Sequence, residues 1–351
     1  MKKVETAVLS RIHSIEFPFF SGFLAHYLDR LGFDRVFLIQ GENADTAPLQ
    51  AQIEWLGFGD RVDILMPKRF DDAEALFDGL MPNLAERCEW LLLADLDEYV
   101  YLGERSIKGL LASHKGQYRV VHFRSVMVAS AQEAPTGYAE VVAQASMFPK
   151  WMTKTVYQTA GIKTMTAHIP IGRKPIPPKK EFIHEIVTPI ATTPFEFHFC
   201  SRGLRDILLR SIRQNFPSAN VKATDMEVLK RFLVRRGDVK TLGEVPGRFA
   251  VLMVQLMEDV SARPRIALAG RIAADMLGHI HFDMAMFDRM LAAALDSIGL
   301  PADAKRRIFE GRLLSNCLEQ VIDRFWKDEV RAGLDSLNYV KIIKKMQGRS
   351  Y

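Results

Sequence analysis

The chain has 351 residues, of which 48% are hydrophobic and 25% charged, a composition typical of folded globular proteins and unlike that of disordered chains. Its formal charge of +5 comes from 47 basic and 42 acidic residues, which is compatible with phosphate-bearing ligands without requiring them. No segment interleaves basic and aromatic residues as nucleic-acid-binding surfaces do, so we expect no nucleic-acid partner. The three cysteines are too few and too far apart for a disulfide framework or a thiolate zinc site, and no signal or membrane-spanning segment is evident. We therefore expect a cytoplasmic protein.

Short apolar runs alternate with helical patterns up to residue 94, which predicts a mainly parallel sheet with crossover helices. The last apolar run, Trp90 to Ala94, carries apolar side chains on both faces, so we expect it at the centre of the sheet. The predicted strands are 8–12, 36–39, 62–65 and 90–94, and the predicted helices are 18–31, 48–56 and 72–86.

The pattern changes twice along the rest of the chain. Between Val120 and His198 it is strand-like and irregular, and a basic, proline-broken loop lies at 172–180. From Gly203 onward it is helical, which gives an α/β domain over 1–216 and a mainly helical region over 217–351. The helices predicted there are 204–215, 225–235, 248–261, 266–277, 284–298 and 302–331.

An acidic cluster, Asp95-Leu96-Asp97-Glu98, follows the predicted central strand. Ligands of such sheets bind beyond the carboxyl ends of the strands. If the strand geometry continued, Asp95 and Asp97 would point to the same side and could share Mg²⁺ or Mn²⁺, which prefer oxygen ligands. The alternative is a pair of turn or helix-capping residues. Carboxylates crowded at a buried strand end repel one another unless a positive group is present, which favours a site.

The segment from Trp90 to Tyr99 resembles the W-x-x-x-x-D-x-D-E-F/Y motif of bacterial glycosyltransferase 2-like families, which are also similar to glycosyltransferase family 92. The resemblance extends over about residues 6 to 216 and follows the family's order of motifs. It departs from the family at Ile15, where the family has asparagine, and at Gln40, where it has aspartate. It also lacks the family's serine in the segment from Gln40 to Thr46, has Phe199 in place of tyrosine, and has an altered order of Ser201 and Arg202. Further positions that match are Glu16, the segment from Leu31 to Asp34, Asn43, Asp45, Lys154, His168 and the segment from Phe197 to Arg202.

This resemblance implies a GT-A fold, which is a Rossmann-like, mixed and mainly parallel sheet, and metal-dependent transfer from a nucleotide sugar. It assigns Asp97 as a metal ligand, Asp95 as shared between ribose and metal, and His198 as the third ligand. Glu98 is expected to be a structural or acceptor-side carboxylate. His198 could instead be a histidine bonded to backbone, and the basic residues could be solvated charges. The donor-binding residues implied are Glu16, Asn43, Asp45, Asp95, Lys154, His168 and Arg202.

The catalytic base is the least determined part of the site. An inverting transferase needs a carboxylate beside the acceptor hydroxyl, whereas a retaining one does not need it there. Glu181, Glu185 and Glu196 all lie in the appropriate stretch, and we assign the role to Glu185, next to His184.

The expected reaction is transfer of a monosaccharide, from a UDP-sugar, to a saccharide or lipid-linked saccharide of a surface polysaccharide or lipopolysaccharide. The basic amphipathic segment 339–346 could contact the inner face of a membrane or be a solvated terminus. Two other functions fit the acidic cluster. A haloacid-dehalogenase-like phosphohydrolase would use Asp95 as nucleophile, although Tyr99 stands where that family has Thr or Val. A nucleotide-sugar-binding protein without catalysis would account for Gln40.

Overall fold

The computed structural model describes residues 2–40, 45–66, 73–114, 116–165, 170–172, 176–184, 193–213, 223–235, 268–321 and 323. Its Cα positions group into two compact units that alternate along the chain. The first unit comprises Met1–Val126, Pro149–His198 and Phe216–Ser218, and the second comprises Met127–Phe148, Phe199–Asn215 and Ala219–Tyr351. The division into 1–216 and 217–351 refers to a catalytic domain and its helical appendage, and it stays a prediction.

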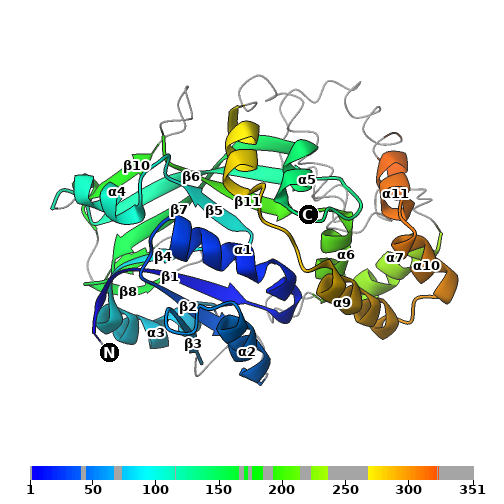
Figure 1. The fold of residues 1–351 in the computed structure, drawn as a ribbon, viewed down its shortest axis with the longest axis horizontal. Helices are drawn as coiled ribbons and strands as arrows, with labels where there is room; N and C mark the ends of the chain where they lie inside the picture. Colours follow the sequence, from blue (N-terminus) through cyan, green and yellow to red (C-terminus); the bar gives the residue numbers. More distant parts are fainter. Residues whose placement is uncertain are drawn as a thin grey trace. The chain divides into compact units, whose positions relative to one another are not determined.

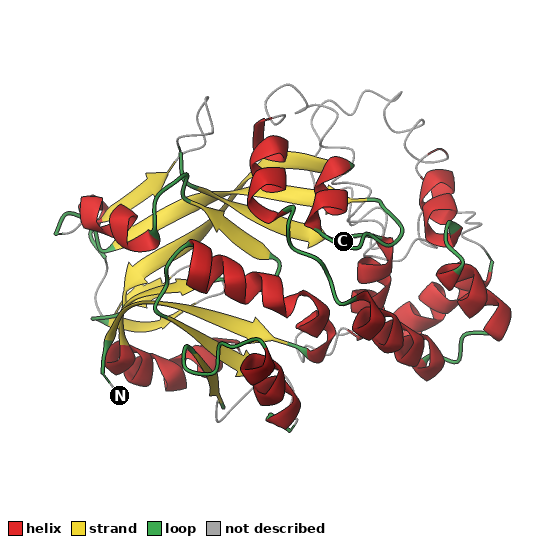
Figure 2. Ribbon diagram, in the orientation of Figure 1, coloured by secondary structure: helices red, strands yellow, loops and turns green. Residues whose placement is uncertain are grey.

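A mixed, mainly parallel sheet organises the fold (Figures 1 and 2). Its order is β3-β2-β1-β4-β7-β6-β11-β5, with β10 paired to β6. The first four strands in that order are parallel, and β7 and β5 run antiparallel to β4 and β11, respectively. The structure therefore confirms the predicted α/β class, the four predicted strands and the interior position of the fourth. The strands are β1 (Val4–Ile12), β2 (Arg35–Gln40), β3 (Val62–Leu65), β4 (Cys88–Leu93), β5 (Glu98–Tyr101), β6 (Val120–Ser130), β7 (Ala145–Gln158), β10 (Glu181–His184) and β11 (Phe195–Ser201), and a separate hairpin is formed by β8 (Ile162–Met165) and β9 (Pro170–Gly172).

The parallel strands bury side chains on both faces, as their continuous apolar runs predict. Successive residues of a strand point to opposite faces, so Leu92 packs in one hydrophobic cluster and its neighbours Leu91 and Leu93 pack in another. The cluster around Leu92 also takes residues from α2 (Ala47–Trp55), α4 (Ile107–His114) and the helical segment that follows β1. The other cluster takes residues from α3 (Ala73–Arg87).

The helical segment after β1 differs from the single helix predicted over 18–31. It consists of a 3₁₀ turn η1 (Ser14–Phe19), a short α1 (Phe20–Leu24) and a π-helical turn η2 (Ala25–Arg30). The N–H of Leu31 donates to the carbonyl of His26, five residues back, which gives the wider turn. The segment ends before Gly32, as predicted, because Gly32 adopts a left-handed φ of 73°.

The second unit is helical beyond Gly203, which confirms the predicted helical character for its described residues. One helix was predicted over 302–331, but the described residues up to 321 form two, because Gly311 and Arg312 adopt φ values of 89° and 69° that an α-helix cannot contain. The predicted helix 248–261 and segment 339–346 lie outside the described residues. The helices here are α5 (Tyr138–Ala143), α6 (Leu204–Arg213), α7 (Ala223–Val234), residues 268–277, α9 (Met284–Ser297), α10 (Ala302–Phe309) and α11 (Leu313–Val321).

Two further findings concern the cysteines and membrane spans. All three cysteines lie in the described part of the chain and are free thiols. Within that same part, none of the helices has both the length and the apolar character needed to span a bilayer.

Candidate functional site

The acidic cluster forms a turn between two strands. Strand β4 ends at Leu93 and β5 begins at Glu98, so Asp95 and Asp97 do not continue strand geometry. The N–H of Glu98 donates to the carbonyl of Asp95 at 3.0 Å, and the N–H of Asp95 donates to Oε2 of Glu98 at 2.7 Å. This reciprocal pair closes the turn.

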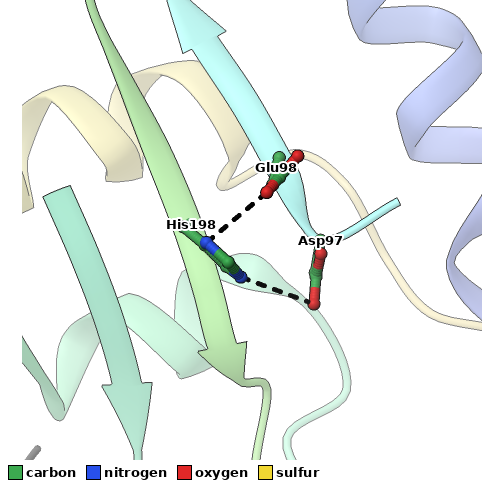
Figure 3. Close-up of side chains that lie close together, drawn as sticks. All are labelled: Asp97, Glu98 and His198. Carbon is green, nitrogen blue, oxygen red and sulfur yellow. Dashed lines mark ion pairs between the residues drawn. The ribbon is translucent and has the colours of Figure 1, made fainter. Parts of the chain in front are cut away.

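Asp97, Glu98 and His198 converge in the first unit (Figure 3). Glu98 and His198 are directly opposed across the antiparallel pair of β5 and β11, so their side chains lie on the same face. Nδ1 of His198 is 3.5 Å from Oε1 of Glu98, and Nε2 of His198 is 4.0 Å from Oδ2 of Asp97. One ligand atom from each residue lies within 4.8 Å of the others. Two carboxylates and one imidazole are a donor set that fits Mn²⁺ or Mg²⁺.

Among the described residues, no other three carboxylate, imidazole or thiol side chains come this close together. The trio is graded in exposure: the side chain of His198 is 20% exposed, that of Asp97 9% and that of Glu98 0%. A ligand that arrives from solvent therefore reaches His198 and Asp97 before Glu98.

The Asp95 carboxylate forms an ion pair with Arg11 of the neighbouring strand β1. The Arg11 guanidinium, near the end of β1, donates to both carboxylate oxygens of Asp95, at 3.1 and 3.3 Å. Burial alone would raise the pKa of Asp95, but the positive charges of Arg11 and Lys154 hold it below its usual value. Asp95 lies outside the trio, and its shared ribose and metal role stays a prediction.

Lys154, on β7, is the internal counter-charge of Glu98. Its Nζ lies 2.6 Å from Oε2 of Glu98, and its side chain is only 2% exposed. Burial by itself would lower the pKa of Lys154, but Glu98, Asp95 and Glu196 more than offset it, so the ammonium stays charged. The donor-binding role expected of Lys154 stays a prediction. Its ammonium already has a carboxylate partner.

A fourth carboxylate beside Asp95, Asp97 and Glu98 is that of Glu196. It lies two residues before His198 on β11, so both side chains are on the same face of that strand. It is fully buried, and its Oε2 accepts a hydrogen bond from the Ser125 hydroxyl at 2.5 Å. Burial raises the pKa of Glu196, and the charges of His198 and Lys154 oppose that shift. Glu196 was one of three candidates for the base, and the sequence offered nothing that distinguished it.

Sequence reasoning missed Arg11 and Ser125 altogether. Both lie on strands, where single polar residues are easily taken for ordinary surface positions. Arg11 had one usable signal: it stands near the end of the first predicted strand, at the same sheet edge as Asp95.

The remaining predicted residues divide into two groups. Glu16 accepts from the His13 N–H at 3.3 Å, Asp45 accepts from the Ala47 N–H at 2.9 Å, and Arg202 donates to the Tyr138 hydroxyl at 3.1 Å in the second unit. These contacts give each residue a local structural partner, and their donor-binding roles stay predictions. The others, Asn43, His168 and Glu185, lie outside the described residues.

No protein-family model matches the chain, and no curated protein matches it in sequence. Matching solved structures include residues 1–349 of TarS from S. aureus in complex with UDP-GlcNAc, at 10% identity over 93% of this chain and 92% of that chain, with a TM-score of 0.35. The galactosyltransferase LgtC with donor and acceptor sugar analogues has 10% identity over 67% and 96% of the chains and a TM-score of 0.31. A 4-diphosphocytidyl-2C-methyl-D-erythritol synthase from Anaerococcus prevotii has 11% identity over 45% and 71%, with a TM-score of 0.27.

Proposed function

We propose that this chain is a metal-dependent glycosyltransferase of the GT-A kind, which moves a monosaccharide from a nucleotide sugar, UDP-linked, to a saccharide acceptor. The observation that carries the proposal is the trio of Asp97, Glu98 and His198. Asp97 lies in the turn after β4, Glu98 begins β5, and His198 lies opposite Glu98 on β11. Sheets of this class bind their ligands beyond the carboxyl ends of their strands, which is where the turn after β4 lies. The sequence resemblance around Trp90 to Tyr99 supports the same reaction.

The residues present fit a divalent cation, Mn²⁺ or Mg²⁺. Asp97 and His198 are the more exposed members of the trio, so they would hold the ion at the solvent side. When bound, such an ion neutralises the charge that develops on the departing diphosphate. Arg11 lies beside Asp95 and keeps that carboxylate ionised, so that it can accept a hydrogen bond from a ribose hydroxyl.

The phosphohydrolase alternative is disfavoured by the surroundings of Asp95. That chemistry requires one oxygen of Asp95 to attack phosphorus. In the structure both oxygens accept hydrogen bonds from Arg11, and the pKa is held low, which makes the carboxylate a weaker nucleophile.

Several parts of the proposal are inferred from sequence alone. Glu185 is proposed as the base of an inverting reaction, and it follows His184 at the end of β10. We propose that the acceptor is a saccharide or lipid-linked saccharide of a surface polysaccharide. We also propose that the enzyme works in the cytoplasm, at the inner face of the membrane.

The test is UDP-sugar turnover with Mn²⁺, comparing Asp97→Asn with the wild type. We expect at least a roughly 100-fold loss of turnover, since a direct metal ligand is removed with little change of shape. Asp29→Asn is the matched control, because Asp29 forms an exposed ion pair with Arg61 at 2.7 Å elsewhere in the same unit. Undiminished turnover in Asp97→Asn, or phosphate-ester hydrolysis by the wild type, would contradict the proposal.

A further inference from the structure

We propose that Glu98 and Lys154 are positioning residues, which orient the imidazole of His198 so that Nε2, together with Asp97, faces the cation. This inference rests on the proposed function and refines its metal site. It reassigns Lys154 from donor binding to the support of a metal ligand, and it makes Glu98 a residue that orients a ligand rather than a ligand.

The backbone sets Glu98 in place before any ligand binds. Glu98 is paired with His198 in the register of β5 and β11. The Tyr27 hydroxyl donates to the carbonyl of Glu98 at 2.9 Å, and a ring nitrogen of His26 lies 3.0 Å from the carbonyl of Val100. Both residues belong to the π-helical turn η2, whose wider geometry brings two successive side chains to β5. The strand that carries Glu98 is therefore held from the helix side.

Oε2 of Glu98 already has two partners within the protein. Oε2 is 2.6 Å from Nζ of Lys154 and accepts a hydrogen bond from the N–H of Asp95 at 2.7 Å. A carboxylate oxygen with two such partners has little electron density left for a cation. Bidentate binding of a metal by Glu98 would require both contacts to break.

The other oxygen faces the histidine. Oε1 of Glu98 is buried and accepts no hydrogen bond from the described residues, and Nδ1 of His198 lies 3.5 Å from it. A carboxylate beside one ring nitrogen stabilises a proton there and leaves the other nitrogen with its lone pair. That other nitrogen, Nε2, is the one that lies 4.0 Å from Oδ2 of Asp97.

The distance between His198 and Asp97 suits a shared cation. The 4.0 Å between Nε2 of His198 and Oδ2 of Asp97 is short enough for one cation to reach both atoms, since Mg²⁺ binds its ligands at about 2.1 Å. The order of exposure agrees, since His198 and Asp97 are the solvent-side members and Glu98 is fully buried. The buried chain from Lys154 through Glu98 to His198 thus has the form of a support behind a metal ligand.

The first experiment examines the metal-free protein by ¹⁵N NMR of labelled histidines, at mildly alkaline pH where imidazoles are ordinarily neutral. His198→Gln assigns the signal. We expect the shift of a protonated nitrogen at Nδ1 and of a lone-pair nitrogen at Nε2, and in Glu98→Gln a mixture of the two tautomers. The opposite tautomer in the wild type, or an unchanged one in Glu98→Gln, overturns the proposal.

The second experiment measures Mn²⁺ affinity by electron paramagnetic resonance without nucleotide. Glu98→Gln and Lys154→Met should each weaken binding about 10- to 100-fold, as outer-shell substitutions do, whereas Asp97→Asn should weaken it further. Lys108→Met is the matched control, since Lys108 also pairs with a carboxylate, that of Asp34, at 2.5 Å. The Mn²⁺ affinity of this variant should equal that of the wild type. A loss in Glu98→Gln equal to that in Asp97→Asn would identify Glu98 as a ligand and overturn the proposal.

The two proposals can fail separately. If the wild type binds no Mn²⁺ but shows the expected tautomer, the proposed metal dependence fails and the orientation of His198 stands. If Mn²⁺ binds and the tautomer is reversed, the positioning role fails and the proposed function stands. Should Lys154→Met not fold, the tautomer of the wild type and of Glu98→Gln still decides.

Discussion

Two clusters of the first unit each contain histidine, and their surroundings differ in chemistry. Around His198 there are carboxylates and a buried lysine. Around His184, at the end of β10, there are aromatic rings: Phe123 stacks on it with centroids 5.7 Å apart, and Phe182 meets it edge-on at 4.7 Å. His114 of α4 lies 5.6 Å away. One cluster is built from charge and the other from packing.

The contrast shows that the residue type by itself does not assign a role. Burial, together with the charges of the neighbouring His114 and Arg105, lowers the pKa of His184 to about 4, so its ring is a neutral packing element. His198 has two carboxylates within 4.0 Å and can hold a cation between itself and Asp97. The predictions below test that contrast.

The largest effect on stability is expected from Lys154→Met. It leaves Glu98 buried without its cation, which typically costs about 3 to 5 kcal/mol. Urea unfolding followed by circular dichroism measures the change. Lys108→Met removes a more exposed lysine from its carboxylate and should cost no more than about 1 kcal/mol. Equal losses in the two variants would show that the Lys154 pair is no more important than a surface one.

Next in size is the effect of His198→Gln on turnover and Mn²⁺ affinity, each expected to fall about 10- to 100-fold because an imidazole ligand is lost. His184→Gln should change neither, because that ring lies among aromatic side chains. Assays with UDP-sugar and Mn²⁺ compare them. A similar loss in both variants would remove the distinction between the clusters.

The smallest effect is a pH dependence of stability that arises from His184. Its folded pKa, about 4, lies below the usual unfolded value of about 6.5, so the unfolded chain binds the extra proton first. This contribution is therefore complete above pH 6.5 and is lost as the pH falls toward 4, by about 1 to 2 kcal/mol at pH 5. Urea midpoints of the wild type and His184→Phe at pH 7 and pH 5 measure it. His184→Phe should lose less stability than the wild type between pH 7 and pH 5. An identical loss would show that His184 is not the source of this pH dependence.

Much of the α/β part could be predicted because its signals are local. The apolar run Trp90 to Ala94 identified an interior strand, and Gly32 identified the end of a helical segment. The prediction of a single helix after β1 was wrong in detail, because the π-helical turn depends on contacts of His26 and Tyr27 with β5, about 70 residues away in sequence. The break near Gly311 was missed because Arg312 shares the left-handed conformation, which arginine rarely adopts.

For the site, residue type and order along the chain indicated an acidic cluster at a strand end, and the family resemblance pointed to Asp97 and His198. Which basic side chain lies beside which carboxylate depends on the tertiary structure. Arg11 meets Asp95, and Lys154 meets Glu98, across 84 and 56 residues of sequence, through the neighbouring strands β1 and β7. In a buried site the charge state and geometry of a group depend on its nearest opposite charge, and the register of paired strands sets that distance.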